Sequence, residues 1–350
     1  MADPDHPQAA TAPLLYAAFG AQSSQILYIV AKLGLADRIR EGHRTATDLS
    51  RVIGADAAAL RRVLIGLVAL GACKEIDDGQ FDLTPLGEYL RDDHPDSIRF
   101  RLILNGEVHY ALWADILPTI TTAEPASQRV FGTSFYDHLA RHSEVGSVFD
   151  RAMASAGGVR YRFRPSVEAY DFGQFRSIVD VGGGNGTLMV EVLKTYPEPN
   201  GVVFDVPRLA EAARQTIDAA GLTTRCKFIG GNAFETVPAG ADAYVLSNFL
   251  ISWGDDEALT PLRNCRKAIA PRGKLLVVEW VMPAGGELRE GFRFWDTVMM
   301  DLIMLAAFGS RSGYVRTRAE FQALFAAAGF RLTEIIRTAA SVCVIEAVPV

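Results

Sequence analysis

From residue 176 onward, short apolar runs alternate with amphipathic stretches, a pattern typical of strands followed by helices. The predicted strands cover residues 177–182, 201–207, 226–230, 242–250 and 273–283. This alternation predicts a mostly parallel, doubly wound α/β sheet with helices on both faces. Two further runs, 331–337 and 340–348, are close enough in sequence to pair as a hairpin. That hairpin would add one antiparallel strand to the otherwise parallel sheet.

The N-terminal part has a helical pattern. Residues 14–40 are apolar at helical spacing, and two shorter helices follow, the first of them opening on Thr45 as a candidate cap. Residues 73–90 then offer two short strands around Asp78-Gly79, which completes a winged-helix pattern. A DNA-recognition helix needs several exposed basic and amide groups. Because the second helix carries only Arg61 and Arg62 among apolar residues, we expect a structural or dimerisation module.

Residues 96–170 also have a helical pattern. Their large apolar and aromatic residues are expected to pack in the interior: Trp113, Phe131, Phe135, Tyr136, Phe149 and Met153.

The composition narrows the class of protein. The chain has 350 residues, 49% hydrophobic and 22% charged, which is typical of a globular protein of about two domains. A net charge of -6 gives no electrostatic reason to bind nucleic acid or an anionic membrane. No signal-type stretch and no uninterrupted run of about 18 apolar residues occurs, so we expect no membrane span and a cytoplasmic location.

The cysteines are Cys73, Cys226, Cys265 and Cys343. None forms a CxxC pair or has histidine neighbours at metal-ligand spacing. We therefore expect reduced, mostly buried thiols and no metal site.

A glycine-rich turn carries the strongest chemical signal. Asp180 ends a strand, Gly182, Gly184 and Gly186 follow, and a helix begins. Glycines let the backbone approach a ligand, and the helix N-terminus favours negative charge. Asp205 ends the next strand, where a carboxylate can accept both hydroxyls of a ribose. Two acids around this turn fit a nucleoside with a charged amino-acid tail. That description suits S-adenosyl-L-methionine (SAM) better than NAD.

With these motifs the chain resembles the large O-methyltransferase family of plant caffeate, acetylserotonin and bacterial natural-product enzymes. The resemblance covers nearly the whole chain and includes DVGGGNG, FDVPRLAEAA, SWGDDEALTPLRNCRKAI and EFQALFAAAGF. It implies a winged-helix-like domain over 1–165 for dimerisation and substrate capping, and a Rossmann-like SAM-binding domain over 166–350. It also implies a homodimer in which residues 14–40 reach the partner's pocket.

The resemblance assigns residues to the cofactor. Gly182, Gly184 and Gly186 would line the SAM tail, and Asp205 would hold the ribose. Asn232, which stands where the family usually has Asp, would lie at the adenine with Phe234. Ser247 would lie near the sulfonium. The full expected cofactor set is Asp180, Gly182, Gly184, Gly186, Asp205, Asn232, Phe234, Ser247 and Trp253.

The sequence departs from the family at its catalytic signature. Where the family has His-Asp-Trp, this chain has Ile251-Ser252-Trp253. A second family acid falls on Val315 and is missing, while Glu279 matches a third. All six histidines lie within the first 142 residues, so the C-terminal half cannot supply a histidine base.

Three residues remain as candidates for catalysis: His109, Glu279 and Asp301. His109 could instead be a packed or capping histidine, and Asp301 a salt-bridged structural acid, whereas a substrate-side role is favoured for Glu279. Alignment of the reactants can lower a barrier by about 7–11 kcal/mol, whereas a positioned base contributes about 10²–10⁴ in rate. We therefore expect a SAM-dependent methyltransferase that acts on a small aromatic or heterocyclic metabolite, at C, N or O, by alignment. The alternative is a SAM-binding homologue that performs hydroxylation, decarboxylation or pericyclic chemistry without methyl transfer.

Overall fold

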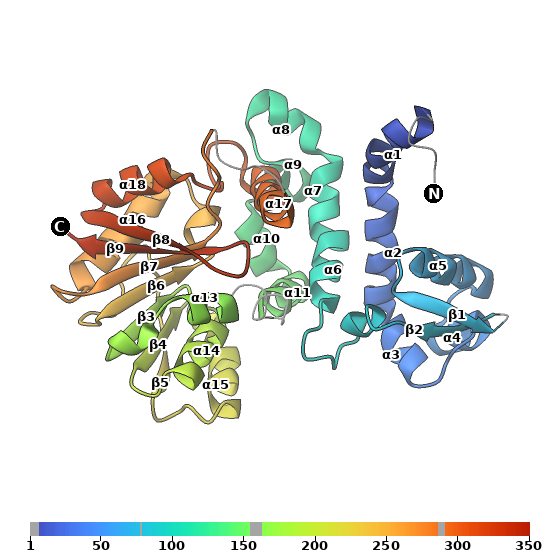
Figure 1. Cartoon of the computed structure of the whole chain (residues 1–350), viewed down its shortest axis with the longest axis horizontal. Coiled ribbons are helices and arrows are strands. Elements are labelled where there is room, and N and C mark those ends of the chain that lie inside the picture. Colours follow the sequence, from blue (N-terminus) through green and yellow to red (C-terminus); the bar gives the residue numbers. More distant parts are fainter. Residues whose placement is uncertain (1–6, 78, 155–162, 286–290) are drawn as a thin grey trace. The chain divides into compact units, whose positions relative to one another are not determined.

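The computed structural model describes residues 7–77, 79–154, 163–285 and 291–350 (Figure 1). The chain divides into two compact units. The first contains the described residues of Met1–Tyr110 and Ser147–Ala156, and the second those of Ala111–Gly146 and Gly157–Val350.

The first unit consists of helices around a two-stranded hairpin. Its elements are α1(Pro7–Ala18), α2(Gly20–Leu33), α3(Leu35–Arg40), α4(Ala46–Ile53), α5(Ala57–Ala69), β1(Cys73–Asp77), β2(Gln80–Leu83), η1(Gly87–Leu90), α6(Arg99–Leu104) and η2(Asn105–His109). The predicted cap is confirmed, because Thr45 Oγ1 accepts a hydrogen bond from Asp48 N at 3.1 Å. The predicted hairpin is confirmed as well, with Cys73 paired to Leu83 in antiparallel register. Asp78 lies outside the described residues.

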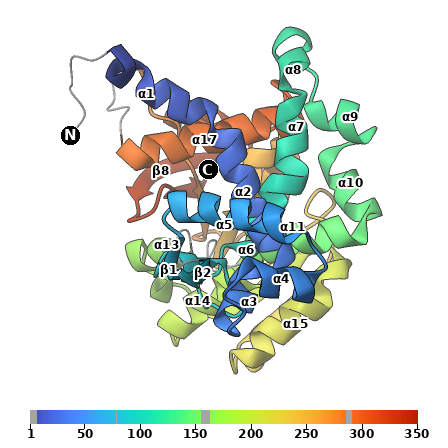
Figure 2. The same cartoon turned by 90° about the vertical axis from the view of Figure 1, so that its right-hand side faces the viewer.

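The second unit begins with short helices in succession (Figure 2). These are α7(Tyr110–Ala114), which starts at the end of the first unit, α8(Ile116–Thr122), α9(Ala126–Phe131) and α10(Phe135–Arg141). The next helix, α11(Ser143–Ala154), contributes residues to both units, and α13(Arg164–Ala169) and η4(Phe172–Gln174) lead into the sheet.

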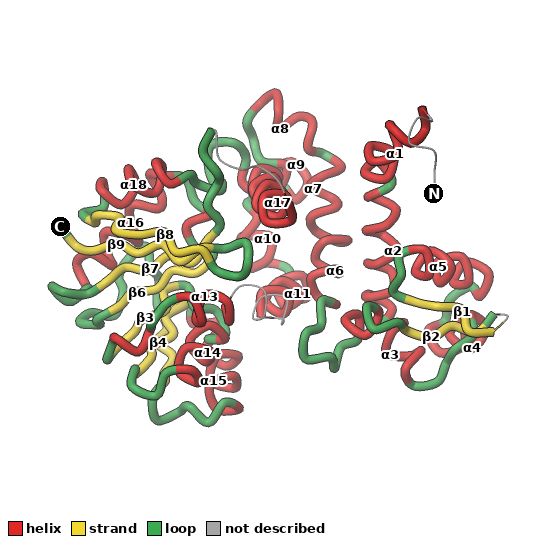
Figure 3. Tube along the Cα trace, viewed as in Figure 1, coloured by secondary structure: helices red, strands yellow, loops and turns green. Residues whose placement is uncertain are grey.

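A seven-stranded sheet forms the centre of the second unit, with the order β5-β4-β3-β6-β7-β9-β8. The strands, yellow in Figure 3, are β3(Ser177–Val181), β4(Asn200–Asp205), β5(Cys226–Gly230), β6(Ala243–Ser247), β7(Lys274–Glu279), β8(Phe330–Arg337) and β9(Cys343–Pro349). The first five are parallel, and β9 pairs antiparallel with both β7 and β8. Both the parallel sheet and the terminal hairpin predicted from the sequence are therefore confirmed.

Helices cover both faces of this sheet (Figure 1). They are α14(Thr187–Thr195) and α15(Ala210–Ala219), and α16(Asp255–Ala268) and α18(Arg318–Ala327). The unit also contains η5(Pro207–Leu209), η6(Leu250–Ser252) and α17(Gly291–Phe308). One apolar cluster joins α14 and α15 to one face through residues such as Leu193, and a second joins α16 and α18 to the other through residues such as Leu262. Along β6, Val245 belongs to the first cluster and Leu246 to the second, as the alternation of side chains along a strand requires.

The strand order places a topological switch between β3 and β6. From β3 the chain moves to β4 and β5 on one side, and later to β6 and β7 on the other. In open α/β sheets, ligands bind beyond the carboxyl ends of the strands at such a point.

The compact units do not divide at residue 165. Residues 111–146 belong with the sheet because α8 and α9 pack on α17. Ser127 Oγ donates to Ala307 O at 2.6 Å, and Ser310 N donates to Ala123 O at 3.3 Å. The division of dimerisation and cofactor binding between 1–165 and 166–350 stays a prediction.

One helical stretch, Thr11–Leu33, is 23 residues long with a mean hydropathy of 1.3. By length and composition it could cross a membrane, although polar residues interrupt it. A signal sequence or a core helix has the same properties, so the stretch by itself indicates none of the three.

The four cysteines are buried free thiols, as expected from their spacing. Among the residues that the structure describes, no three His, Cys, Asp or Glu side chains group as metal ligands.

We predict that Gly87→Ala destabilises the first unit. A Cβ on Gly87 would lie 1.9 Å from Ala72 O, a backbone atom that already accepts from Thr84 N. Overpacking of this kind costs about 1–3 kcal/mol, so thermal unfolding should shift several degrees downward. Gly285→Ala is the matched control, because its Cβ would meet no atom within 4 Å. Equal unfolding temperatures for the two variants would contradict the predicted clash.

Candidate active site

Asp180 and Ser247 lie at the carboxyl ends of the adjacent parallel strands β3 and β6. Asp180 is in register with Val245 of β6 and with Val203 of β4. Asp205 closes β4 at the same edge of the sheet. The strand pairing thus brings together three residues that are up to 67 positions apart in the sequence.

The glycine-rich turn connects β3 to α14 in a conformation that requires glycine. Gly182, Gly184 and Gly186 have φ values of +75°, +59° and +81°. A Cβ on Gly182 would lie 2.4 Å from the Phe249 ring, and one on Gly183 would lie 2.7 Å from Asp180 Oδ2. The turn is therefore closely packed around the Asp180 carboxylate.

Asp205 is bound to this turn. Its Oδ2 accepts a hydrogen bond from Gly184 N at 2.8 Å, and its Oδ1 accepts one from Val206 N at 2.6 Å. The backbone therefore orients the carboxylate beside the glycines, which is the location that the ribose assignment requires.

Three polar groups at the strand ends are buried and have no hydrogen-bond partner within the described chain: both Asp180 carboxylate oxygens, Ser247 Oγ and Asn248 Oδ1. Asp180 is 1% exposed. Burial and the neighbouring Asp205 charge raise the pKa of the Asp180 carboxyl to about 7. An isolated buried carboxylate is costly unless a cation or donor pairs with it. These groups therefore fit a ligand that carries an ammonium group, as the amino-acid tail of SAM does.

Asn248 was not predicted as a site residue. Its φ of +51° is uncommon for a residue other than glycine, and its backbone N donates to Val278 O at 3.1 Å. Backbone strain of this kind is typical of functional sites. Nothing in the local sequence indicates this conformation.

The two residues expected at the adenine belong to the turn after β5. Asn232 is engaged locally, since its Oδ1 accepts from Phe234 N at 3.0 Å and its Nδ2 donates to Glu235 Oε1 at 3.1 Å. The Phe234 ring packs edge-on against Trp253, with centroids 4.7 Å apart. The structure therefore brings Phe234 and Trp253 together.

The turn η6, which follows β6, carries Ile251. Glu279, at the end of β7, accepts a hydrogen bond from Ile251 N at 3.0 Å. Burial raises the pKa of the Glu279 carboxyl to about 7, although the Arg316 charge and the backbone N–H groups of residues 249–251 favour the ionised form. Glu279, predicted as a catalytic acid, thus also binds the backbone of the turn that carries Ile251.

Arg316 binds the same turn through the turn's carbonyl groups. Its Nη1 donates to Leu250 O at 2.9 Å and its Nη2 to Trp253 O at 2.8 Å. Its Nε donates to Asp255 Oδ1 at 2.9 Å, and the residue is 1% exposed. The role of Arg316 was not predicted, because surface arginines and buried arginines look alike in a sequence.

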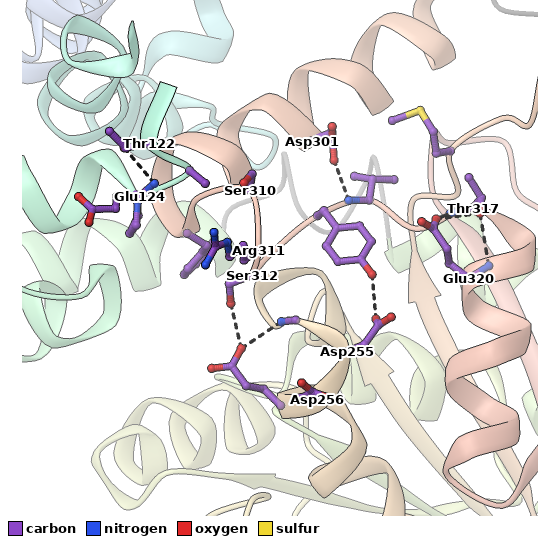
Figure 4. Close-up of a pocket in the computed structure, with 18 residues that line it drawn as sticks. Thr122, Glu124, Asp255, Asp256, Asp301, Ser310, Arg311, Ser312, Thr317 and Glu320 are labelled. Atoms are coloured by element: carbon purple, nitrogen blue, oxygen red, sulfur yellow. Dashed lines mark hydrogen bonds between the residues drawn. The ribbon is translucent and has the colours of Figure 1, made fainter. Parts of the chain in front are cut away.

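Asp301 binds a backbone group of a different segment. Its Oδ1 accepts from Val315 N at 2.8 Å, and burial raises the pKa of its carboxyl. It lines a cavity of about 1280 Å³ that none of the predicted cofactor residues line (Figure 4). The other acids of this cavity include Glu257 and Glu320, which cap α16 and α18, so helix capping accounts for part of its acidic character.

His109 belongs to the first unit, whereas the predicted cofactor residues belong to the second. Its Nδ1 lies 2.9 Å from Asn105 Oδ1 within the same π-helical turn. Burial and the Arg101 charge lower the pKa of the imidazole to about 3, so the ring is neutral at physiological pH. The catalytic roles of His109, Glu279 and Asp301 stay predictions.

Residues 113–331 match the O-methyltransferase domain, and residues 15–93 match the O-methyltransferase dimerisation domain. The chain is 40% identical to a phenazine O-methyltransferase from Lysobacter antibioticus, over 93% of each chain. The crystal structure of LaPhzM superposes with a TM-score of 0.90 at 38% identity and covers 97% of this chain and 99% of the other.

Two further relatives are named for other reactions. An 8-amino-8-demethylriboflavin N,N-dimethyltransferase from Streptomyces davaonensis is 35% identical, over 95% of this chain and 93% of the relative. An aclacinomycin 10-hydroxylase from Streptomyces purpurascens is 33% identical, over 87% and 80%. The structure of NcsB1 with S-adenosyl-L-homocysteine and 1,4-dihydroxy-2-naphthoic acid has a TM-score of 0.78 at 32% identity, and covers 93% of this chain and 96% of the other.

The fold, the site and these matches define a SAM-dependent methyltransferase. The chain belongs to the O-methyltransferase family, and its cofactor is S-adenosyl-L-methionine. The winged-helix pattern of the N-terminal part belongs to the family's dimerisation domain, as predicted.

We predict that SAM affinity rises with pH through neutrality and that Asp180→Asn removes this dependence. The Asp180 carboxyl has a pKa of about 7, and a bound cation favours its ionised form, so binding near pH 6 must release a proton. Calorimetric titrations at pH 6 and pH 8, in buffers of different ionisation enthalpy, measure both the affinity and the proton release.

Thermal unfolding without cofactor provides a second test. Because the pKa of Asp180 is higher in the folded than in the unfolded state, the folded protein loses stability as the pH rises from about 4 towards 7. Asp180→Asn should therefore gain stability relative to the wild type between pH 5 and pH 8. A difference that does not change with pH would contradict the buried, ionisable state of Asp180.

Proposed function

We propose that this chain transfers a methyl group from SAM to a small aromatic or heterocyclic acceptor by alignment, without a histidine base. The observation that carries the proposal is a set of unpartnered polar groups at the strand ends, together with an apolar residue where the family resemblance expects a histidine. Asp180, Ser247 and Asn248 present unpartnered polar atoms, while Ile251 is 4% exposed within an apolar cluster.

Different residues of the chain would bind the different parts of SAM. Asp180 and Asn248 would bind the amino-acid tail, Ser247 would lie near the sulfonium, and Asp205 would accept the ribose hydroxyls. Phe234 and Trp253 would contact the adenine. When bound, SAM supplies an electrophilic methyl group, and the protein's task is to align an acceptor with it.

The apolar position at Ile251 restricts the acceptors that react well. A neutral phenol has a pKa near 10 and benefits most from a base. An amine, an ionised phenol or an electron-rich carbon needs no proton removal before attack. Relatives that methylate nitrogen and oxygen support an acceptor range of this kind.

We also propose that the chain forms a homodimer. The dimerisation-domain match begins at residue 15, and Leu14, Leu15, Tyr16 and Phe19 are each more than half exposed. Exposed apolar residues in succession are typical of a surface that a partner covers. By family likeness these helices would reach the pocket of the second copy.

Methyl transfer is tested with a panel of aromatic acceptors. We expect wild-type protein with SAM to add one methyl group to a monohydroxyphenazine, a dihydroxynaphthoate or an aminohydroxybenzoate, with one S-adenosylhomocysteine released per product. Asp205→Ala should weaken SAM binding by about 1–3 kcal/mol, because buried hydroxyls lose their acceptor.

A product formed without S-adenosylhomocysteine would instead support the non-methylating alternative, which the similarity to the aclacinomycin 10-hydroxylase favours. Absence of methylated product across phenol, amine and carbon acceptors would contradict methyl transfer.

Replacing Ile251 tests the missing base. We expect Ile251→His to raise the rate with a neutral phenol at pH 7 by about 10-fold or more, because a positioned base contributes about 10²–10⁴. The rate with a phenol that is already ionised should change little. Ile251→Leu conserves volume and is the control. A rate that falls equally for both acceptors, in a variant that unfolds like the wild type, would contradict the proposed specialisation.

A further inference from the structure

The connection between α17 and α18, residues 309–317, lies against the turn η6. A Cβ on Gly313 would lie 3.0 Å from Ile251 O, so the two backbones are in close contact. A Cβ on Gly254, the residue before α16, would lie 2.8 Å from Arg311 O. The α17–α18 connection therefore contacts both the turn that carries Ile251 and the start of α16.

Side chains of the α17–α18 connection bind the first turn of α16. Tyr314 Oη donates to Asp255 Oδ1 at 2.9 Å, and Ser312 Oγ donates to Glu257 Oε2 at 2.9 Å (Figure 4). Because α16 begins only a few residues after η6, these hydrogen bonds keep the connection beside the turn.

Arg316 reaches from the α17–α18 connection to the turn itself. Its guanidinium donates to Leu250 O and Trp253 O, and the residue is 1% exposed. A guanidinium presents its donors in a fixed, planar arrangement, and burial leaves the side chain little freedom. The position of the turn therefore depends on the position of the Arg316 backbone.

Asp301, in α17, binds the backbone next to Arg316. Its Oδ1 accepts a hydrogen bond from Val315 N at 2.8 Å, and Val315 is 5% exposed. Arg316 O accepts a hydrogen bond from Met282 N at 2.9 Å. These two residues of the connection are thus bound on one side to α17 and on the other to the residues after β7. Loss of the carboxylate would leave the Val315 N–H, in a buried stretch, without this acceptor.

We propose that Asp301 is a positioning residue, which holds Val315 and, through Arg316, fixes the turn η6 at which the methyl acceptor is aligned. This inference rests on the proposed function, in which alignment replaces a base. Asp301 makes no contact with the acceptor in this role and transfers no proton. Its partner is a backbone N–H, so the role differs from both the substrate ligand and the salt-bridged acid that the sequence leaves open.

The chemistry explains why the effect should fall on kcat. Displacement at a methyl group requires the attacking atom, the methyl carbon and the sulfur in line, so a displaced turn misaligns the reactants. A misplacement of about 1 Å, caused by a mutation far from the reacting atoms, can cost about 10²-fold in rate. The acids expected at the cofactor, Asp180 and Asp205, belong to β3 and β4, so cofactor affinity should change much less.

The test compares Asp301→Ala with Asp301→Asn, using a monohydroxyphenazine and an aminohydroxybenzoate as acceptors. Asparagine retains an oxygen that can accept from Val315 N, whereas alanine does not. We expect Asp301→Ala to lower kcat about 10-fold, with the acceptor KM and the S-adenosylhomocysteine Kd within about threefold of wild type. Asp301→Asn should recover most of the rate. Equal losses of kcat in the two variants would show that the charge itself is needed and would overturn the positioning role.

Hydrogen–deuterium exchange of the protein without ligand tests the same role independently of activity. In wild type, Ile251 N donates to Glu279 and Trp253 N donates to Leu250 O. Peptides that span residues 248–254 should exchange about threefold faster or more in Asp301→Ala, because a less constrained turn opens more often. They should exchange at the wild-type rate in Asp301→Asn. Unchanged exchange in Asp301→Ala would overturn the inference.

The matched control is Glu124→Ala. Glu124 is an exposed acid that lines the same cavity as Asp301, from the connection between α8 and α9. Removal of this charge should leave both kcat and the exchange of residues 248–254 at wild-type values. A change equal to that of Asp301→Ala would attribute the effect to the charge of the cavity and would overturn the positioning role.

Arg316→Lys provides a second variant, which also decides the question if Asp301→Ala does not fold. Lysine keeps the charge but loses the forked donors, so the turn should again exchange faster and kcat should fall. The double variant should lose no more activity than the more affected single variant, because both residues act on the same turn. Unchanged exchange in Arg316→Lys, or additive losses in the double variant, would contradict a pathway from Asp301 through Arg316.

The outcomes separate the inference from the proposed function. If wild type methylates no probe while Asp301→Ala still exchanges faster at residues 248–254, the proposed acceptor class fails and the control of the turn by Asp301 stands. If wild type methylates a probe and Asp301→Ala matches it in both kcat and exchange, only the inference fails.

Discussion

The buried carboxylate of Asp180 is the constraint on which the functional half of this protein depends. It lies at the end of a central strand, 1% exposed, with both oxygens unpartnered in the described chain. A charged group in this position costs several kcal/mol unless a cation or donor pairs with it. Gly183 lacks a Cβ that would lie 2.7 Å from this carboxylate, and Asp205 adds a second negative charge nearby. The fold therefore maintains a locally unfavourable arrangement that a cationic ligand relieves.

The turn after β6 is also fixed by buried hydrogen bonds. Glu279 binds the backbone N–H of Ile251, and Arg316 binds the carbonyls of Leu250 and Trp253. Two buried side chains thus fix a short turn that carries Ile251 where the family resemblance expects a histidine. A rigid turn of this kind suits a reaction in which alignment of the acceptor supplies most of the acceleration.

Much of the fold could be predicted because its signals are local. Alternating strands and helices indicate the parallel sheet, and the final two apolar runs indicate the antiparallel hairpin. The glycine turn and Asp205 could be identified together because a strand, a tight turn and an acid occur at short, regular spacing. Strand register then brings Asp180 and Ser247 to one edge, as the topology of a parallel sheet requires.

The rest depends on contacts between segments far apart in the sequence. Tyr136 meets Ser252 across 116 positions, and Arg316 meets Leu250 across 66. No local pattern distinguishes such a tyrosine from a core residue, and Tyr136 was indeed expected only to pack. Asn248 adopts a positive φ that its neighbours do not indicate. Asp301 faces the backbone of Val315, which a helical pattern alone could not reveal.

The most direct test of the account is a crystal structure of the protein with S-adenosylhomocysteine. We expect the amino group of the nucleoside tail within hydrogen-bond distance of Asp180, directly or through one water molecule. The ribose hydroxyls should then bind Asp205. A nucleoside bound elsewhere, with the Asp180 carboxylate still without a partner, would contradict the assignment of this edge of the sheet to the cofactor.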